Sequence, residues 1–308
     1  MTTDIERLNE ANAGHDDDPQ GAAALLRQID VAQLPPERWP NYAFLLNHVL
    51  GEKLSAWHEA LAGQERVIAA AQPTPALVLW RQLGSAALVV NAAEPLAQAV
   101  SGLVAAGGTA ASRAHELLAL GAAMYLAPSQ AATDAGQTAL RALAPVMYSA
   151  WPTGTALDAQ AAACTNNLAS GLLERDDADL RNGAVRAAIA TGAELAERLW
   201  RQAGTWVHQE RALYLRALAC TVLGEPHLAR RHAIDGLALL DAHDSAQSEN
   251  VDRAFLELER WNACIWLGLE AEAEGALARA QALAAGFNEA GLTQWFETRR
   301  RRLPGFRR

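Results

Sequence analysis

The sequence predicts an all-α protein, a solenoid of about six antiparallel helical hairpins. Hydrophobic residues recur at helical spacing through almost the whole chain. No run of β-branched residues bounded by turn residues predicts a strand. The helices expected to open successive hairpins begin near residues 41, 76, 112, 156, 207 and 251, so a two-helix unit recurs every 35 to 51 residues.

Pro and Gly separate most of the expected helices. Two short helices, near residues 5–13 and 21–29, precede the hairpins. The expected hairpin helices and the last helix cover residues 41–50, 55–71, 76–91, 95–106, 112–126, 130–143, 156–175, 178–203, 207–223, 226–241, 251–267, 270–285 and 289–302. Pro95 and Pro226 fall in first turns, where proline removes no helical hydrogen bond.

The expected domain organisation has three parts in one continuous solenoid. An N-terminal helical cap covers 1–35, and hairpins of short period cover 36–150. Hairpins of longer period, ending in a C-terminal capping helix, cover 151–308. Each hairpin cannot bury its apolar face alone, so neighbouring hairpins are expected to stack and share one long core.

The composition excludes several functional classes. Of the 308 residues, 51% are hydrophobic, and the net charge is −9. Nucleic-acid binding needs a basic face, so no nucleic-acid partner is expected. The most apolar stretch, residues 84–106, is interrupted by Asn91, Glu94 and Pro95, so no membrane span is expected. The first residues carry no hydrophobic signal segment, and the expected location is the cytoplasm.

The titratable residues show no recognised metal or cofactor motif. Cys164, Cys220 and Cys264 lie far apart in apolar segments, so buried reduced thiols are expected. His48 and Glu52 are four residues apart on an expected helix, but no H-E-x-x-H pattern accompanies them. No glycine-rich phosphate loop is present either. The sequence therefore predicts neither a metal nor a cofactor.

A short motif on one expected helix resembles a known repeat. Trp80, Leu83, Gly84 and Ala87 form W-x2-L-G-x2-A, which is similar to the opening of the tetratricopeptide repeat, with Ala at the place of its aromatic residue. Residues 213–240 carry a second clear copy, and weaker copies cover 44–68, 168–188 and 258–283. The chain resembles the tetratricopeptide-repeat family over roughly residues 40–290.

The resemblance implies a right-handed superhelix that binds a peptide or protein along its concave face, without catalysis. Matching the first-helix positions of that family nominates Arg81, Gln82, Ser85, Asn166, Asn167, Ser170, Glu174, Arg211 and Tyr214 as partner-binding residues. An Asn amide can bond a peptide backbone through both donor and acceptor, and an Arg can hold a carboxylate. Trp295 is a further candidate for an exposed contact. The predicted function is therefore a cytoplasmic scaffold that binds a protein or peptide, whose identity stays open.

Two other functions remain as alternatives. Asn166, Ser170 and Glu174 form N-x3-S-x3-E on one helical face, which resembles the magnesium-binding element of class I terpene cyclases. The Asp-rich DDxxD half of that site is missing, so the chain is not expected to be an enzyme. The second alternative is a homo-oligomeric structural module, such as a homodimer that pairs through its capping helices.

Overall fold

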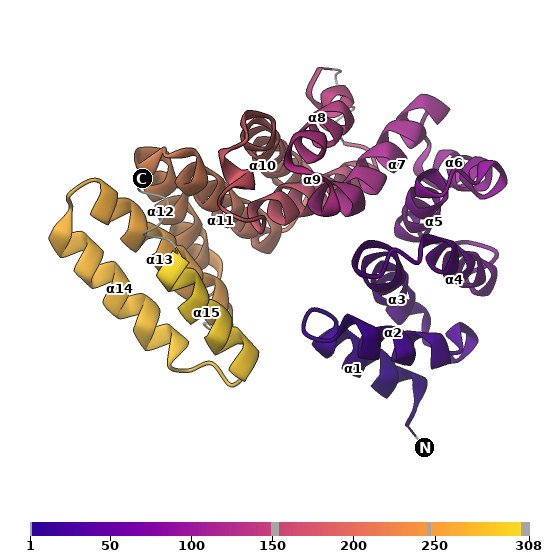
Figure 1. Cartoon of the computed structure of the whole chain (residues 1–308), viewed down its shortest axis with the longest axis horizontal. Coiled ribbons are helices and arrows are strands. Elements are labelled where there is room, and N and C mark those ends of the chain that lie inside the picture. The colour runs from indigo at the N-terminus through magenta and orange to yellow at the C-terminus, as the bar shows by residue number, and fades with distance from the viewer. Residues whose placement is uncertain (1, 149–153, 245–247, 303–308) are drawn as a thin grey trace. The chain divides into compact units, whose positions relative to one another are not determined.

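The computed structural model describes residues 2–148, 154–244 and 248–302 (Figure 1). In these ranges the chain forms fifteen α-helices and no strand, which confirms the predicted all-α class. The chain divides into two compact units, Met1–Cys164 (unit 1) and Thr165–Arg308 (unit 2). No helix in the described ranges is long and apolar enough to cross a membrane.

The division between the units falls inside one helix, α9 (Asp158–Leu173). Unit 1 contains α1 (Asp4–Gly14), α2 (Pro19–Gln28), α3 (Trp39–Leu45), the π-helix η3 (Leu46–Lys53), α4 (Trp57–Ala70), α5 (Leu77–Val89), α6 (Ala93–Gly107), α7 (Ala111–Leu126) and α8 (Ala132–Tyr148). Unit 2 contains α10 (Gly183–Ala203), α11 (Trp206–Leu223), α12 (Pro226–His243), α13 (Asn250–Trp266), α14 (Glu270–Ala284) and α15 (Ala290–Arg302). The change of period expected at 150/151 lies among residues 149–153, outside the described ranges.

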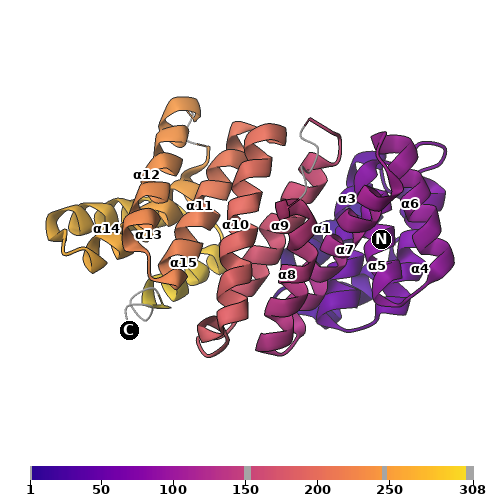
Figure 2. The same ribbon diagram turned by 90° about the horizontal axis from the view of Figure 1, so that it is seen from above.

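After α1 and α2, the helices pair in the predicted order. The segment α3–η3 packs on α4, α5 on α6, α7 on α8, α11 on α12, and α13 on α14. Helices α9 and α10 approach closely at Gly192, where an added Cβ would lie 3.1 Å from Ala169 Cβ. The described residues thus form the six predicted hairpins. Figure 2 shows α10, α11 and α12 of unit 2 side by side.

Small residues set the packing in unit 1, as the repeat motif predicts. Gly84 on α5 faces both neighbouring helices, because an added Cβ would lie 2.5 Å from Leu118 on α7 and 2.9 Å from Ala99 on α6. Trp80, one turn earlier, packs its ring on Gly102 of α6, where an added Cβ would be 2.3 Å from the indole. The large and small residues of W-x2-L-G therefore fill one interface.

Two local features differ from the expected helices. Residues 41–50 were expected to form one α-helix, but α3 ends at Leu45 and continues as the wider π-helix η3. Leu54 N–H accordingly donates to the carbonyl of Val49, five residues earlier. Residues 178–203 also split, because Asn182 caps the N-terminus of α10 by accepting from the N–H groups of Ala184 and Val185.

Candidate functional site

Unit 2 contains a groove lined by the end of α9, by α11 and by α15, which we call the α9–α15 groove. Its volume is about 270 Å³. The lining residues are Ser170, Leu173, Glu174, Tyr214, Leu218, Trp295, Thr298, Arg299 and Arg302. The set joins apolar side chains to hydroxyl and charged groups, a mixture typical of ligand-binding pockets.

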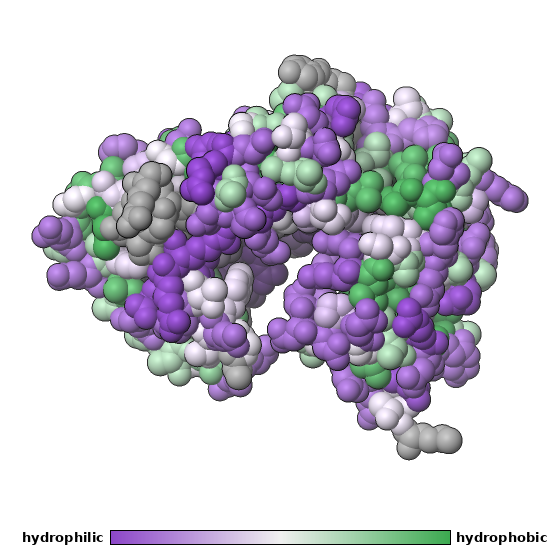
Figure 3. All heavy atoms as spheres, in the orientation of Figure 1, coloured by the Kyte–Doolittle hydropathy of each residue, from purple (hydrophilic) through white to green (hydrophobic). Residues whose placement is uncertain are grey.

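One side chain in the middle of α15 and one at its C-terminal end hold this helix against the rest of unit 2. Phe296 is buried in an apolar cluster, and its ring meets Phe255 of α13 edge to face at 5.7 Å. At the C-terminal end of α15, Arg302 donates to the carbonyl oxygen of Arg175, just after α9, at 2.6 Å. Helix α15 therefore spans from α13 to the end of α9. Figure 3 shows hydrophilic surface over the arginine-rich end of this helix.

Tyr214 on α11 is the polar group on the floor of the α9–α15 groove. Its ring packs edge to face on Phe255 at 6.2 Å. The hydroxyl has almost no exposed surface and no hydrogen-bond partner among the described residues. Burial raises the pKa of the phenol, so the group stays a neutral O–H donor. A buried hydroxyl without a hydrogen-bond partner lowers the free energy of unfolding by about 1–3 kcal/mol, and a bound ligand that accepts a hydrogen bond from it would regain this energy.

Trp295 supplies the most exposed large apolar side chain of the same groove. Its ring lies 4.2 Å from that of Phe255, yet 51% of the residue is exposed, as expected from the sequence. A half-exposed indole fixed against a buried ring offers a flat apolar surface at low entropic cost.

The structure brings together three of the nine nominated residues, Ser170, Glu174 and Tyr214, in the α9–α15 groove. Asn166 and Asn167 also lie on α9 but outside the lining, and Asn166 donates to the side chain of Asn167 at 3.2 Å. Arg211 donates to Asp252 at 2.8 Å and to Glu249 at 3.3 Å, so its guanidinium joins α11 to the start of α13.

The three nominated residues of unit 1 are buried, which corrects the expectation that they face a partner. Arg81 donates to Cys164 Sγ at 3.1 Å. Gln82 accepts from Asn47 Nδ2 at 2.8 Å and from the hydroxyl of Tyr125 at 2.8 Å. Ser85 is covered by α7, because Gly121 brings that backbone so close that a Cβ would lie 2.3 Å from Ser85 Oγ. These three polar side chains therefore lie in the interior of unit 1, where Ser85 Oγ and Gln82 Nε2 have no hydrogen-bond partner among the described residues.

The magnesium-enzyme alternative meets an electrostatic obstacle. Ser170 and Glu174 share their groove with the guanidinium groups of Arg299 and Arg302. Mg²⁺ prefers several carboxylate oxygens and water, whereas Glu174 is the one carboxylate in this lining and arginine cannot coordinate a cation. Asn166, the third member of the proposed element, is not part of this lining.

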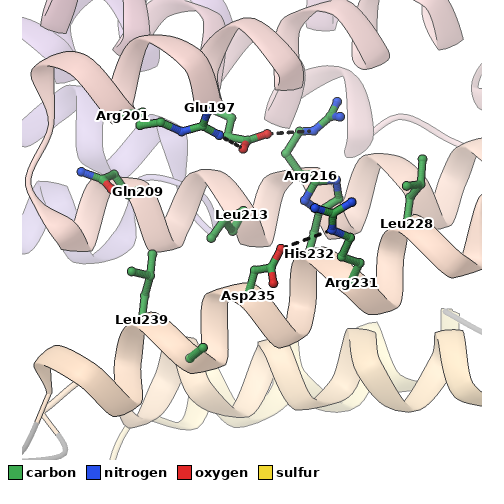
Figure 4. Close-up of a pocket in the computed structure, with 11 residues that line it drawn as sticks. Glu197, Arg201, Gln209, Leu213, Arg216, Leu228, Arg231, His232, Asp235 and Leu239 are labelled. Carbon is green, nitrogen blue, oxygen red and sulfur yellow. Dashed lines mark hydrogen bonds and ion pairs between the residues drawn. The ribbon is translucent and has the colours of Figure 1, made fainter.

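A second cavity of about 600 Å³ lies between α10 and α12 over α11, and we call it the α10–α12 groove (Figure 4). Its lining residues are Glu197, Arg201, Gln209, Leu213, Arg216, Leu228, Arg231, His232, Asp235, Ala238 and Leu239. Figure 4 shows Glu197 between Arg201 and Arg216, and Arg231 beside Asp235. Sequence reasoning did not identify this cavity, whose residues come mainly from second helices.

The α10–α12 groove carries more positive than negative charge in a chain whose net charge is −9. Three arginines face two carboxylates, and the Arg231–Asp235 pair is loose at 3.7 Å. Burial and the charge of Arg216 lower the pKa of His232, so its ring is neutral at pH 7. The arrangement suits an acidic group that competes for the exposed guanidinium of Arg231.

Glu210 on α11 is a buried carboxyl group close to the nominated Arg211. Burial raises its pKa, and the charge of Asp252 and a hydrogen bond to it raise the pKa further, to about 9. Glu210 is therefore protonated at neutral pH. Asp252, whose negative charge acts on Glu210, accepts a hydrogen bond from Arg211.

Comparisons with known proteins give no family. No family model matches the chain, and no curated protein matches its sequence. Among solved structures, the apo form of the quorum sensor NprR from B. thuringiensis is 15% identical, with a TM-score of 0.39, over 99% of this chain and 87% of that chain. A likeness of this size transfers no function.

Proposed function

We propose that this chain is a non-catalytic helical scaffold that binds a peptide in the α9–α15 groove. The observation that carries the proposal is the unpartnered hydroxyl of Tyr214 next to the half-exposed indole of Trp295. A peptide carbonyl would give the hydroxyl its missing acceptor, and a neighbouring apolar side chain would cover the indole. Ser170 and Thr298 offer further hydroxyl groups for the peptide backbone.

We also propose that the protein works in the cytoplasm. The three cysteines are free and buried, as the sequence predicts. Persistent free thiols suit a reducing compartment, since oxidising compartments favour disulfides.

The test uses a random dodecapeptide library selected on the full chain. Enriched peptides are labelled, and their dissociation constants are measured by fluorescence polarisation against the parent and its variants. We expect Tyr214→Phe to weaken binding about fivefold to tenfold, the effect of one hydrogen bond. The same variant should be at least as stable as the parent, because it removes a buried unpaired hydroxyl. Trp295→Ala should weaken binding further, since an exposed aromatic anchor is lost.

The control is Leu269→Ala, which alters an exposed large apolar residue outside both grooves. It should bind every selected peptide like the parent. Equal affinity for the parent, Tyr214→Phe and Trp295→Ala would contradict the proposal, as would a library that yields no binder.

A second candidate site for the same function is the α10–α12 groove, favoured by its size and its arginines. It would take an acidic segment, and Arg231→Ala should then reduce the affinity and its dependence on salt. Loss of binding in Arg231→Ala but not in Trp295→Ala would move the peptide to this groove. Homodimer formation, the remaining alternative, is measured independently by light scattering on a sizing column.

A further inference from the structure

Two histidines and an aspartate converge in unit 1, far from the grooves of unit 2 in sequence. His15 and Asp16 follow directly after α1, and His48 lies on η3. His15 Nε2 is 3.5 Å from Asp16 Oδ2, and His48 Nε2 is 3.8 Å from Asp16 Oδ1. One ligand atom from each residue fits within 4.8 Å of the other two.

Hydrogen bonds orient both imidazole rings with the same nitrogen toward Asp16. His15 Nδ1 lies 2.6 Å from the carbonyl oxygen of Asn12, an atom that can only accept, so this nitrogen carries the proton. His48 Nδ1 lies 2.7 Å from Glu52 Oε2 and donates to that carboxylate. Each ring therefore has its Nδ1–H fixed by an oxygen and presents Nε2 to Asp16, where a metal ion would replace the ion pair of His48 with this carboxylate. Metal-binding histidines are oriented in the same way.

Packing fixes the position of the rings, while the carboxylate stays open to solvent. The ring of His48 stacks on Phe44 at 5.2 Å and meets the ring of His15 edge to face at 5.2 Å. The histidine side chains are 19% and 16% exposed, whereas that of Asp16 is 68% exposed. An ion can therefore enter from the side of Asp16 and find two preorganised nitrogens.

We propose that His15 Nε2, His48 Nε2 and the carboxylate of Asp16 bind a divalent transition-metal ion of the Zn²⁺ class. Tetrahedral zinc with bonds of about 2.0–2.1 Å separates its ligand atoms by about 3.4 Å. His15 Nε2 lies 3.5 Å from Asp16 Oδ2 and His48 Nε2 lies 3.8 Å from Asp16 Oδ1, so the exposed carboxylate must turn to offer one oxygen to an ion held by both rings. Imidazole nitrogens select such ions over Mg²⁺ and Ca²⁺, which prefer oxygen ligands only. With three protein ligands, the fourth position faces solvent.

Lys53 is the competitor for this site. Its Nζ donates to Asp16 Oδ1 at 2.9 Å, so an ammonium group holds the carboxylate that the metal would use. Metal binding must move Lys53 away and overcome its repulsion. Replacing Lys53 by Met keeps most of the stem and removes the charge, so this variant should bind the metal more tightly.

The experiment titrates the full chain with ZnCl2 by isothermal calorimetry, with a parallel thermal melt. We expect one ion per chain and a rise in the melting temperature of the parent, because the folded site binds the ion. Asp16→Asn and His48→Ala should each abolish both effects. Glu52→Gln should weaken affinity about 10–100-fold by loosening the orientation of His48. Lys53→Met should strengthen binding, and MgCl2 should have no effect on any variant.

His58→Ala is the matched control, because this exposed histidine lies nearby in sequence but outside the cluster. It should bind Zn²⁺ like the parent. Asp16 is a surface residue, so Asp16→Asn keeps the test decisive if His48→Ala does not fold. Absence of stoichiometric binding, or binding unchanged in Asp16→Asn, would overturn the proposal. The cluster would then be an ion pair of His48 with Asp16 and Glu52.

Discussion

Arg299 on α15 donates from Nε and Nη2 to Oε1 of Glu259 on α13, at 3.2 and 3.1 Å. The side chain of Glu259 has no exposed surface, and that of Arg299 is 11% exposed. Thr221 Oγ1 donates to the other carboxylate oxygen at 2.8 Å. Because an ion this deep needs a counter-charge, Arg299 both neutralises Glu259 and lines the α9–α15 groove.

Removal of this guanidinium should destabilise unit 2. Arg299→Ala leaves a buried carboxylate without its cation, so we expect the free energy of unfolding to fall by about 3 kcal/mol. Urea unfolding followed by circular dichroism measures the change. Combining Arg299→Ala with Glu259→Gln should recover part of the loss, since the stranded charge is then absent.

The neighbouring Arg300→Ala serves as control for that experiment. Arg300 pairs with Glu297 at 2.7 Å where both side chains are about one-third exposed, and such pairs contribute at most about 1 kcal/mol. If Arg299→Ala lowered the free energy of unfolding no more than Arg300→Ala does, the Arg299–Glu259 pair would not stabilise the packing of α15.

We expect Glu210 to make the stability of the protein depend on pH. Its folded pKa is raised to about 9 by burial and by Asp252, from an ordinary value of 4.5. Between these values the unfolded chain releases the proton and the folded chain keeps it, so stability falls as pH rises through this window. Glu210→Gln cannot ionise. The difference in the free energy of unfolding between Glu210→Gln and the parent should therefore grow, in favour of the variant, by about 2–3 kcal/mol as the pH rises from 5.5 to 8.

Urea unfolding at a series of pH values from 5 to 8.5 measures this difference. The exposed Glu270→Gln should follow the parent at every pH. A constant difference between Glu210→Gln and the parent across the series would mean that Glu210 is ionised in the folded protein.

The helices could be predicted because their signals are local. Every helix expected from the 3.6-residue periodicity has a counterpart in the described residues, and the Gly and Pro boundaries are close to the observed ends. The π-helix η3 could not be predicted in this way. Its wider turn accompanies a tertiary contact, since the ring of Trp57 packs on the backbone of Gly51, where a Cβ would lie 2.5 Å from it.

The site was only partly predictable because polarity does not reveal which face a neighbour covers. Ser85 and Tyr214 both occupy first helices, yet α7 buries Ser85 against Gly121, whereas Tyr214 lines a groove. Likewise His15 and His48 are far apart in sequence and match no metal motif, because their proximity comes from the packing of α1, α2 and η3. Such juxtapositions are tertiary properties.

The polar interior of unit 1 should be sensitive to loss of Asn47. Its Nδ2 donates to Gln82 O and Oε1 at 2.9 and 2.8 Å, and its Oδ1 accepts from Gln64 Nε2 at 2.9 Å. Asn47→Ala removes all three hydrogen bonds in a buried site, so we expect the free energy of unfolding to fall by about 3 kcal/mol. Tyr125→Phe removes a single donor to Gln82 and should cost about 1 kcal/mol.

Hydrogen exchange of the α5 amides, together with urea unfolding, assigns these losses to unit 1. Faster exchange in α5 with unchanged exchange in α13 is the expected pattern for Asn47→Ala. If Asn47→Ala and Tyr125→Phe lowered the free energy of unfolding equally, the three hydrogen bonds of Asn47 would not stabilise unit 1 more than the single bond of Tyr125 does.

Replacing two helical glycines by alanine should change the free energy of unfolding in opposite directions. At Gly84 the new Cβ would lie 2.5 Å from Leu118 and 2.9 Å from Ala99, so α5 must move away from α6 and α7. Overpacking of this kind costs about 1–3 kcal/mol. At Gly275 on α14 the nearest atom is Arg279 Nη1 at 3.3 Å, at the end of a flexible side chain. There the higher helix propensity of alanine should dominate and stabilise the protein by about 0.5–1 kcal/mol. Thermal and urea unfolding of both variants measure the two signs, and a stabilising Gly84→Ala would mean that the helix–helix contact at the W-x2-L-G motif is not close.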